Sequence, residues 1–219
     1  MALLGSAAMV LSFDIEPEAV DEHDDWHTRE HLPERLSIAG FLRGSRWKTA
    51  DGEPRYMVLY EVADLGVLGS AGYLQRLDNP TPWTQKMMKS YRGMRRGFCR
   101  VAASCGAGLG GSATLVRFTP APQREAALRD WLVEQVLPGL ASLAGVASAH
   151  LFQAAGTPAM TAEQQIRGRD KDFGWALLAT GYRLPPAISA EQFMQHGAME
   201  PPQSASYRLE CLLGRGESP

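Results

Sequence analysis

The chain has 219 residues, of which 45% are hydrophobic and 21% are charged, so it can bury a sizeable core. A formal net charge of −2 gives no electrostatic reason to expect a nucleic-acid partner. No apolar run is long enough to span a membrane and the three cysteines lack metal or redox spacing, so we expect a cytoplasmic protein without a membrane partner.

The first part of the chain predicts the order strand, helix, strand, strand, helix, strand. Pro17, among acidic residues, is typical of the first turn of a helix, and Pro33 is expected to end or kink that helix. Ala50-Asp51-Gly52 predicts a hairpin turn. Thr81 followed by Pro82 predicts the start of the second helix. The predicted strands are 9–15, 38–48, 55–62 and 98–103, and the predicted helices are 17–32 and 82–92.

The second part of the chain repeats this order after a glycine-rich stretch, 106–112, which we interpret as a linker between residues 1–105 and residues 113–219. These two segments are called half one and half two below. The charged stretch 156–172 is longer than a hairpin needs, so we expect a mobile surface loop there. In half two the predicted strands are 113–118, 146–153, 173–180 and 206–213, and the predicted helices are 123–137 and 190–196.

This order is that of the ferredoxin-like fold. Strand 55–62 has no cleanly polar face, which indicates a sheet that is covered on both sides. Helices can cover one side, and the sheet of the other half can cover the second. The predicted fold class is therefore α+β, with two ferredoxin-like βαββαβ halves whose antiparallel sheets pack face to face as an intrachain dimeric α/β-barrel. A monomer and a homodimer are both compatible with this plan.

An internal correspondence supports the two-half plan. Four residues of half one recur in half two at one offset of 105 residues, namely Trp26 as Trp131, Leu32 as Leu137, Pro33 as Pro138 and Gly40 as Gly145. Such internal repeats are the signature of a duplicated architecture.

The same offset singles out three histidines. His23, His27 and His31 share one stripe of the first predicted helix, and their counterparts at 128, 132 and 136 are leucine, leucine and valine. Aliphatic residues are typical of a helix stripe that faces a core, so we expect the histidines to face inward as well. A buried polar group needs a partner, which a pocket provides more easily than a core. His27 and His31 are therefore the candidate acid–base residues, with satisfied core histidines as the alternative, and His23 is expected to be exposed or paired among its acidic neighbours.

Further candidates surround this stripe. Tyr60 corresponds to Ala179, so it could present its hydroxyl group to the pocket as a third catalytic residue. Arg46 could bind a carboxylate or an enolate, and Asp14 ends the first strand. The candidate substrate-binding residues are Trp26, Tyr56, Arg46, Trp83 and Asp14, each with core packing or a surface position as the alternative.

Two other patterns are given a structural interpretation. His27-Thr28-Arg29-Glu30-His31 matches the inverted zinc-protease pattern H-x-x-E-H, but a third ligand is missing and Glu30 lies off the histidine stripe. We therefore expect no metal site. The basic residues Arg92, Arg95, Arg96 and Arg100 are interpreted as a solvated helix end.

The segments Glu30-His31-Leu32-Pro33, Arg55-Tyr56 with Tyr60-Glu61, and Pro80-Thr81-Pro82-Trp83-Thr84, together with Trp26 and Gly40-Phe41, resemble the EthD-like branch of the dimeric α/β-barrel superfamily. Half one is similar over nearly its whole length, and half two only in its skeleton. The resemblance implies ferredoxin-like halves joined through their sheets and a small, mostly apolar pocket between sheet and helices. It also implies relatives that include cofactor-independent cyclases, lactone isomerases, monooxygenases and heme-dependent enzymes.

The functional hypothesis is a cofactor-independent enzyme that transfers a proton next to a carbonyl group, in an isomerisation, cyclisation or elimination. Its partner would be a small, largely apolar, aromatic or lactone-like carbonyl compound. Histidine titrates near neutral pH and suits the role of base and then acid. Two alternatives stay open: a non-catalytic module that binds a small ligand, and a heme-dependent or monooxygenase-type enzyme with His27 or His31 as axial heme ligand.

Overall fold

The computed structural model describes residues 3–50, 52–156 and 161–217, so Asp51 of the predicted turn lies outside the described residues. The strands are β1 (Ala7–Ile15), β2 (Phe41–Lys48), β3 (Tyr56–Val62), β4 (Tyr91–Gly106), β5 (Ser112–Phe118), β6 (Val146–Ala154), β7 (Trp175–Gly181) and β8 (Gln203–Gly214). The helices are α1 (Val20–Trp26), α2 (Leu32–Leu36), α3 (Ala71–Asp78), α4 (Pro82–Met88), α5 (Glu125–Trp131), α6 (Leu137–Ala141), α7 (Ala162–Arg167) and α8 (Ala190–His196). No helix among these residues is long and apolar enough to cross a membrane.

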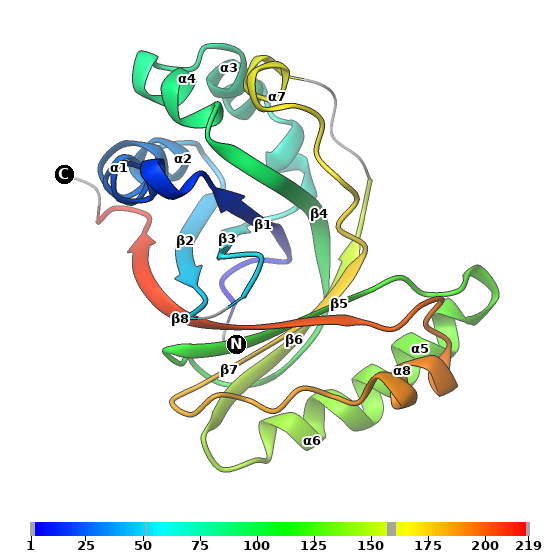
Figure 1. The fold of residues 1–219 in the computed structure, drawn as a ribbon. Coiled ribbons are helices and arrows are strands. Elements are labelled where there is room, and N and C mark those ends of the chain that lie inside the picture. Colours follow the sequence, from blue (N-terminus) through cyan, green and yellow to red (C-terminus); the bar gives the residue numbers. More distant parts are fainter. Residues whose placement is uncertain (1–2, 51, 157–160, 218–219) are drawn as a thin grey trace.

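The strands form one closed barrel in the order β1-β3-β2-β8-β5-β7-β6-β4, in which each pair of neighbours is antiparallel (Figure 1). Half one contributes the order β4-β1-β3-β2 and half two the order β8-β5-β7-β6, which is the ferredoxin-like order in each case. The two sheets meet where β2 pairs with β8 and β4 pairs with β6. The predicted α+β fold class, an intrachain dimeric α/β-barrel, is confirmed.

The buried residues form three cores, one inside the barrel and one under the helices of each half. β3 shows how a single strand serves two of them. Tyr56, Val58 and Tyr60 pack under the half-one helices, whereas Met57 and Leu59 point into the barrel. Every residue of β3 is buried, as expected for a strand covered on both faces.

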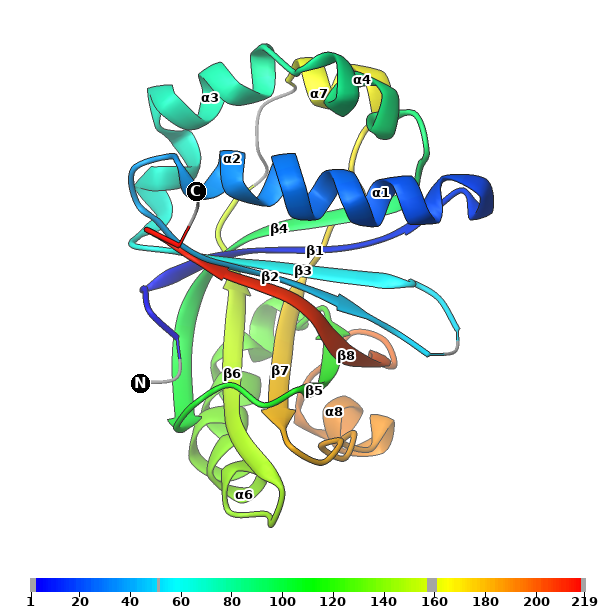
Figure 2. The same cartoon turned by 90° about the vertical axis from the view of Figure 1, so that its left-hand side faces the viewer.

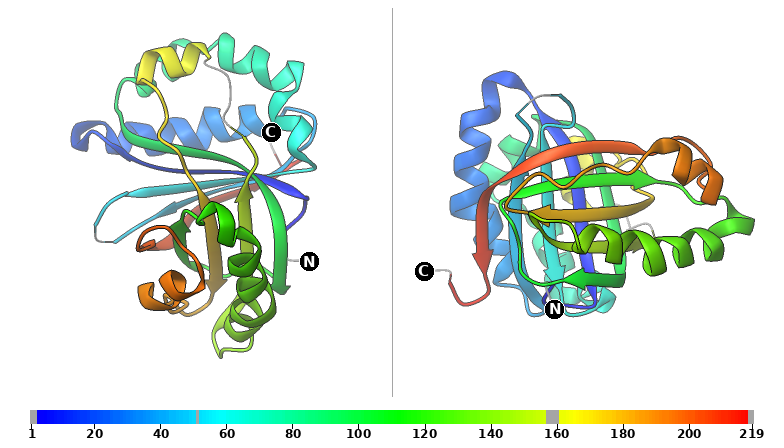
Figure 3. Two further views of the ribbon diagram at one scale, coloured as in Figure 1. Left: turned by 90° about the vertical axis from the view of Figure 1, so that its right-hand side faces the viewer. Right: turned by 90° about the horizontal axis from the view of Figure 1, so that it is seen from below.

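A long helix crosses the outer face of each four-stranded sheet (Figure 2). In half one it consists of α1, a π-helical turn at His27–His31, and α2, so it continues past Pro33 to Leu36. In the π-helical turn the Leu32 N–H donates to the carbonyl of His27, across five residues instead of four. The prediction that this helix ends near residue 32 was therefore wrong. Half two has the same π-helical turn at Leu132–Val136, in the helix on the opposite side of the barrel (Figure 3).

Two boundaries in half one also differ from the prediction. The helix that starts at Pro82 ends at Met88, and β4 begins at Tyr91 rather than at residue 98. The sequence analysis took the arginines at 92, 95 and 96 for a helix end, although they belong to a strand with inward-facing neighbours. The helix α3 was not predicted at all.

The largest difference concerns the charged stretch 156–172. Its described part is not only a surface loop: it contains α7, with the buried residues Glu163 and Gln164. Although α7 belongs to half two, it lies beside α3 and α4 above the helices of half one (Figure 2). Half two thus provides part of the layer, made of α3, α4 and α7, that lies over the half-one helix–sheet core. This layer is called the cover below.

Candidate active site

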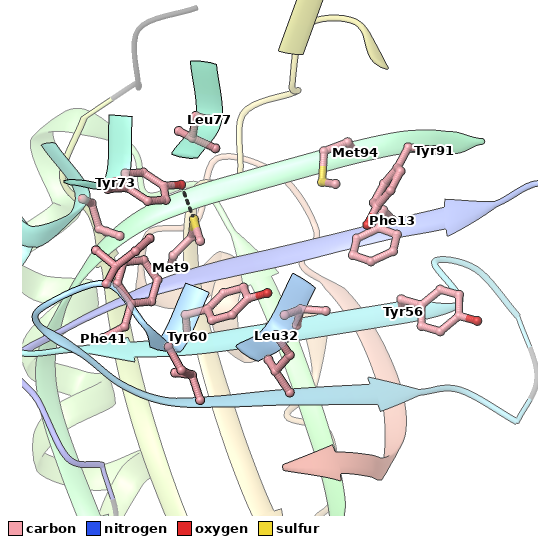
Figure 4. Packing of buried hydrophobic residues seen from close by; sticks show 14 of the residues in the cluster. Met9, Phe13, Leu32, Phe41, Tyr56, Tyr60, Tyr73, Leu77, Tyr91 and Met94 are labelled. Carbon is pink, nitrogen blue, oxygen red and sulfur yellow. Dashed lines mark hydrogen bonds between the residues drawn. The ribbon is translucent and has the colours of Figure 1, made fainter. Parts of the chain in front are cut away.

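A small cavity of about 30 Å³ lies in half one between the sheet and its cover. It can hold one or two small molecules such as water, since one water needs roughly 10–15 Å³ of such space. Figure 4 shows how several of the lining side chains converge from β1, β3 and β4. The lining combines apolar residues with titratable ones: Met9, Leu11, Phe13, Val58, Leu77, Met88 and Met94, with His27, His31, Arg35, Tyr60, Tyr73, Tyr91, Arg96, Glu163 and Arg167.

The predicted catalytic histidines both line this cavity. His27 is 1% exposed and His31 is 8% exposed, and their ring centroids are 5.6 Å apart. The Nδ1 atoms of both rings are buried and have no hydrogen-bond partner among the described residues. Burial opposes the charged form and, with the nearby positive groups, lowers the pKa of both imidazoles well below the usual range. Both rings are therefore neutral at pH 7 and able to accept a proton.

Tyr60, the third predicted catalytic residue, lies on the same wall. Its hydroxyl oxygen is 3.4 Å from His27 Nε2, a hydrogen bond whose donor depends on the histidine tautomer. Burial raises the pKa of Tyr60, so its hydroxyl keeps its proton and can donate a hydrogen bond. Opposite Tyr60, on β2, is Gly44, where an added Cβ would lie 2.5 Å from Leu32. The glycine thus lets the helix approach the strand closely at this point.

His23 was expected to be exposed or paired among its acidic neighbours; it is fully buried, and it is paired with Asp24. Its Nε2 lies 3.2 Å from the hydroxyl of Tyr91, and its Nδ1 lies 3.2 Å from Asp24 Oδ1. Burial opposes ionisation of Asp24, but hydrogen bonds from His23, Lys48 and Tyr56 outweigh it and lower the pKa of the carboxyl group. A chain of carboxylate, imidazole and phenol therefore ends at Tyr91, which lines the cavity.

The cover of the cavity is held by ion pairs between the two halves. Arg35 on α2 donates to Glu163 on α7, and both side chains are nearly fully buried. Arg167, also on α7, binds Asp170 with three hydrogen bonds, and Arg96 Nε lies 2.9 Å from Asp170 Oδ2. The interpretation of Arg96 as part of a solvated helix end was wrong, because it lies on β4 and its side chain is 2% exposed. Its position two residues after Met94 and two before Phe98 was the sequence signal for an inward-facing strand residue.

The five predicted substrate-binding residues do not line this cavity. Trp26 is the nearest: it is buried, its ring centroid is 4.4 Å from that of His31, and its Nε1 donates to Glu30. Trp26 thus packs against the imidazole of His31.

The remaining four lie further away. Tyr56 donates its hydroxyl hydrogen to Asp24, and Arg46 donates to the Asp24 carbonyl and to the Thr28 hydroxyl. Both side chains therefore attach α1 to the sheet. Trp83 donates to Glu22 near the surface. Asp14 accepts from the Arg55 N–H and lines a separate surface hollow of about 540 Å³.

The cavity does not fit a heme group in this conformation. Pockets for drug-sized ligands measure ~300–1,000 Å³, about ten times the cavity or more, and Tyr60 occupies the space next to His27 Nε2. A metal site is also unsupported, because the described residues contain no group of three or more His, Cys, Asp or Glu side chains that could hold an ion.

Comparison with known proteins gives similarity of fold without similarity of sequence. No family model matches the chain, and no curated protein matches it in sequence. Among solved structures, it is similar to an anthrone oxidase-like protein at TM-score 0.69 and 12% identity, covering 100% of this chain and 98% of that one. A candidate monooxygenase from Fusobacterium nucleatum matches at TM-score 0.59 and 7% identity, covering 98% and 97%. A candidate monooxygenase from Lactobacillus acidophilus matches at TM-score 0.58 and 7% identity, covering 96% of each chain. At these identities the likeness establishes the fold alone.

Proposed function

We propose that the protein is a monooxygenase- or oxidase-type enzyme that oxidises a small, largely apolar aromatic compound at a carbon activated by a carbonyl group. The observation that carries the proposal is the pair of neutral, buried imidazoles with unpartnered Nδ1 atoms, next to a protonated phenol in one cavity. Buried polar atoms without partners are rare in structural cores and are typical of sites that a ligand completes.

The reaction begins with proton abstraction. His27 or His31 takes a proton from the activated carbon, and the hydroxyl of Tyr60 donates a hydrogen bond to the enolate oxygen that forms. The imidazolium and the enolate then stabilise each other as an ion pair, which offsets the unfavourable burial of the imidazolium.

The enolate then reacts with dioxygen. Its electron pair forms the new carbon–oxygen bond, and the peroxide oxygen takes the proton back from the imidazolium. Loss of the second hydrogen from the same carbon, with cleavage of the oxygen–oxygen bond, gives a ketone and water. One CH₂ group and one O₂ molecule thus become one C=O group and one H₂O molecule, and dioxygen is the only oxidant required.

Binding of an aromatic substrate requires the cover to move, because the cavity of about 30 Å³ is too small for a ring. The cover is attached to half one through the Arg35–Glu163 and Arg96–Asp170 ion pairs. Ion pairs can re-form with water or ligand when α7 moves, so the cover can open without unfolding the barrel.

The names of the structural neighbours support an oxygen-dependent reaction over the isomerisation or cyclisation expected from the sequence. Membership of the EthD-like branch stays a prediction. The proton-transfer step is common to both reaction types, so oxygen consumption is the measurement that separates them.

The test uses anthrone as the probe, with oxygen uptake and anthraquinone formation measured against the rate without enzyme. We expect enzyme-dependent uptake of one O₂ per anthraquinone, and a decrease of about 10²–10⁴-fold in kcat for His27→Gln or His31→Gln, whichever is the base. Tyr60→Phe should decrease kcat by about 10–100-fold with little change in KM, because the lost hydrogen bond forms in the transition state.

A matched control is Tyr73→Phe, which removes a second cavity hydroxyl that donates only to the sulfur of Met9 (Figure 4). This variant should retain turnover within about threefold. Product formation without oxygen uptake would replace the proposal by an isomerase or cyclase, and binding without any product would leave a binding module. Equal activity of both histidine variants and the wild type would refute the mechanism.

A further inference from the structure

Arg96 is a buried cation in a position that the fold would fill with an apolar residue. It lies on β4 between Met94 and Phe98, which both pack in the half-one core. Its side chain is 2% exposed and lines the cavity that holds His27 and His31. The mechanism above does not use Arg96, and a guanidinium at such a position costs stability unless it is fully paired.

The neighbours of Arg96 do not pair it fully. Asp170 Oδ2 lies 2.9 Å from Nε, yet neither Nε nor Nη2 makes a hydrogen bond to any of the described residues. The oxygens of Asp170 instead accept hydrogen bonds from Arg167 and from the side-chain amide of Gln164. Nη2 is therefore buried without an acceptor among the described residues, and Nε has only the ion-pair contact with Asp170.

The charges around the cavity point in the same direction. Three guanidinium groups line it, from Arg35, Arg96 and Arg167, against the single carboxylate of Glu163. Asp170 lies on the other side of Arg96, where it lines an outer groove of about 950 Å³. The cavity lining is thus net positive, and the unpartnered Nη2 donor of this guanidinium suits a carboxylate oxygen.

We propose that Arg96 binds a carboxylate of the substrate, so that the substrate is an aromatic acid and not a neutral aromatic compound. The proposal deepens the proposed function and rests on it for the identity of this cavity as the substrate site. Arg96 lines both the cavity and the outer groove, whose wall also carries Arg95, Arg117, Arg169 and Lys171, against Asp170, Asp172 and Glu200. A carboxylate that approaches through this basic groove reaches Arg96 first, and its apolar ring then lies toward the imidazoles.

The test compares two probes that differ only in charge, cinnamate and cinnamamide, by isothermal titration calorimetry at pH 7.5. We expect the wild-type protein to bind cinnamate at least about tenfold more tightly than cinnamamide. Arg96→Met should remove this preference by weakening cinnamate binding, while the affinity for cinnamamide changes by less than about twofold. Equal affinity of the wild type for the two probes, or an unchanged preference in Arg96→Met, would overturn the proposal.

Two further variants keep the test decisive. Arg100→Met removes an exposed arginine from the same strand and should retain the wild-type preference. Arg96→Lys keeps the charge but loses the planar guanidinium and its Nη2 donor, so the preference for cinnamate should decrease several-fold even if Arg96→Met does not fold. A full wild-type preference in Arg96→Lys would refute a role for the Nη2 donor.

These results are separable from those of the proposed function, because binding is measured without turnover. Absence of oxygen uptake with anthrone would refute the proposed oxidation and leave the carboxylate site intact. Oxygen uptake with anthrone by the wild type, together with loss of the preference for cinnamate in Arg96→Met, would support both.

Discussion

The long helices of the two halves have the same backbone and different inward-facing side chains. Each contains a π-helical turn, at His27–His31 in half one and at Leu132–Val136 in half two. The half-two residues Leu128 and Leu132 pack in an apolar core, whereas the corresponding His23 and His27 bind tyrosine hydroxyls. π-helical turns are frequent at functional sites, but here the turn occurs where the lining is aliphatic as well. The turn therefore belongs to the fold, and the side chains alone distinguish the candidate site.

The two halves also differ in what lies over their helix–sheet cores. In half one, α7 from the other half lies above the helix–sheet core and brings Glu163 and Arg167 to the cavity. Half two therefore donates charged residues to half one through an insertion between β6 and β7. Both halves therefore contribute to one site: half one provides the imidazoles, and half two provides part of the cover.

The most direct way to break the comparison is to give half one the side chains of half two. In the double variant His27→Leu, His31→Val, anthrone turnover should decrease by about 10²–10⁴-fold, because no base remains in the cavity. The free energy of unfolding should stay equal or increase, since each unpartnered imidazole nitrogen costs about 1–3 kcal/mol. Oxygen uptake and urea unfolding measure the two effects.

The converse substitution, Leu132→His, is the control for this variant. It should leave turnover unchanged and decrease the free energy of unfolding by about 1–3 kcal/mol, because the new imidazole is buried among apolar side chains. If the double variant retained turnover within threefold, the histidine stripe would be structural.

The sequence contained enough information for the barrel and for the inward direction of the histidine stripe. Strand alternation and the offset of 105 residues predicted the order of elements. Because His27 is at the position equivalent to the apolar Leu132, it was expected to face inward as well. For His23 the sequence left exposure and pairing open, because acidic neighbours fit both, and the structure shows it buried and paired with Asp24. Asp24 also makes hydrogen bonds that attach the helix to the sheet.

The cover could not be predicted by the same means, and the alternation signal at Arg96 was missed. α7 has six residues, too few for a helical period to be recognised, and its burial depends on a contact between Arg35 and Glu163, which are 128 residues apart. Arg96 belongs to a cluster of arginines whose members face both sides of β4. Its alternation with Met94 and Phe98 separates its inward side chain from the exposed ones once residues 91–106 are known to form a strand, in which Arg96 pairs with Leu11.

The comparison can be sharpened through the pH dependence of stability. Burial lowers the pKa of His27 and His31 below that of an exposed imidazole. Below about pH 6.5 the unfolded chain therefore binds protons that the folded chain does not, and the free energy of unfolding decreases as the pH falls. The decrease reaches up to about 1.4 kcal/mol per pH unit for each imidazole. Urea unfolding of the wild type between pH 7.5 and pH 5 should show this loss.

The double variant His27→Leu, His31→Val tests whether these two residues cause the loss. Its free energy of unfolding should decrease less steeply below pH 6.5, by up to about 2.7 kcal/mol per pH unit relative to the wild type. Part of the remaining slope comes from His23 and His150, whose pKa values burial also lowers, that of His150 to about 4. Parallel curves for the two proteins would mean that both imidazoles titrate as exposed groups do.

The smallest effect concerns the two tryptophans at equivalent positions. Trp26 packs against His31 and donates to Glu30, whereas Trp131 stacks on His196, with ring centroids 4.2 Å apart, far from the cavity. Replacing either by Phe should decrease the free energy of unfolding by about 1–2 kcal/mol, since a well-packed ring changes shape. Only Trp26→Phe should also lower kcat, by about threefold to tenfold, because His31 loses the surface that fixes its ring. Equal kcat values for the two variants, measured by oxygen uptake, would show that the orientation of His31 does not depend on Trp26.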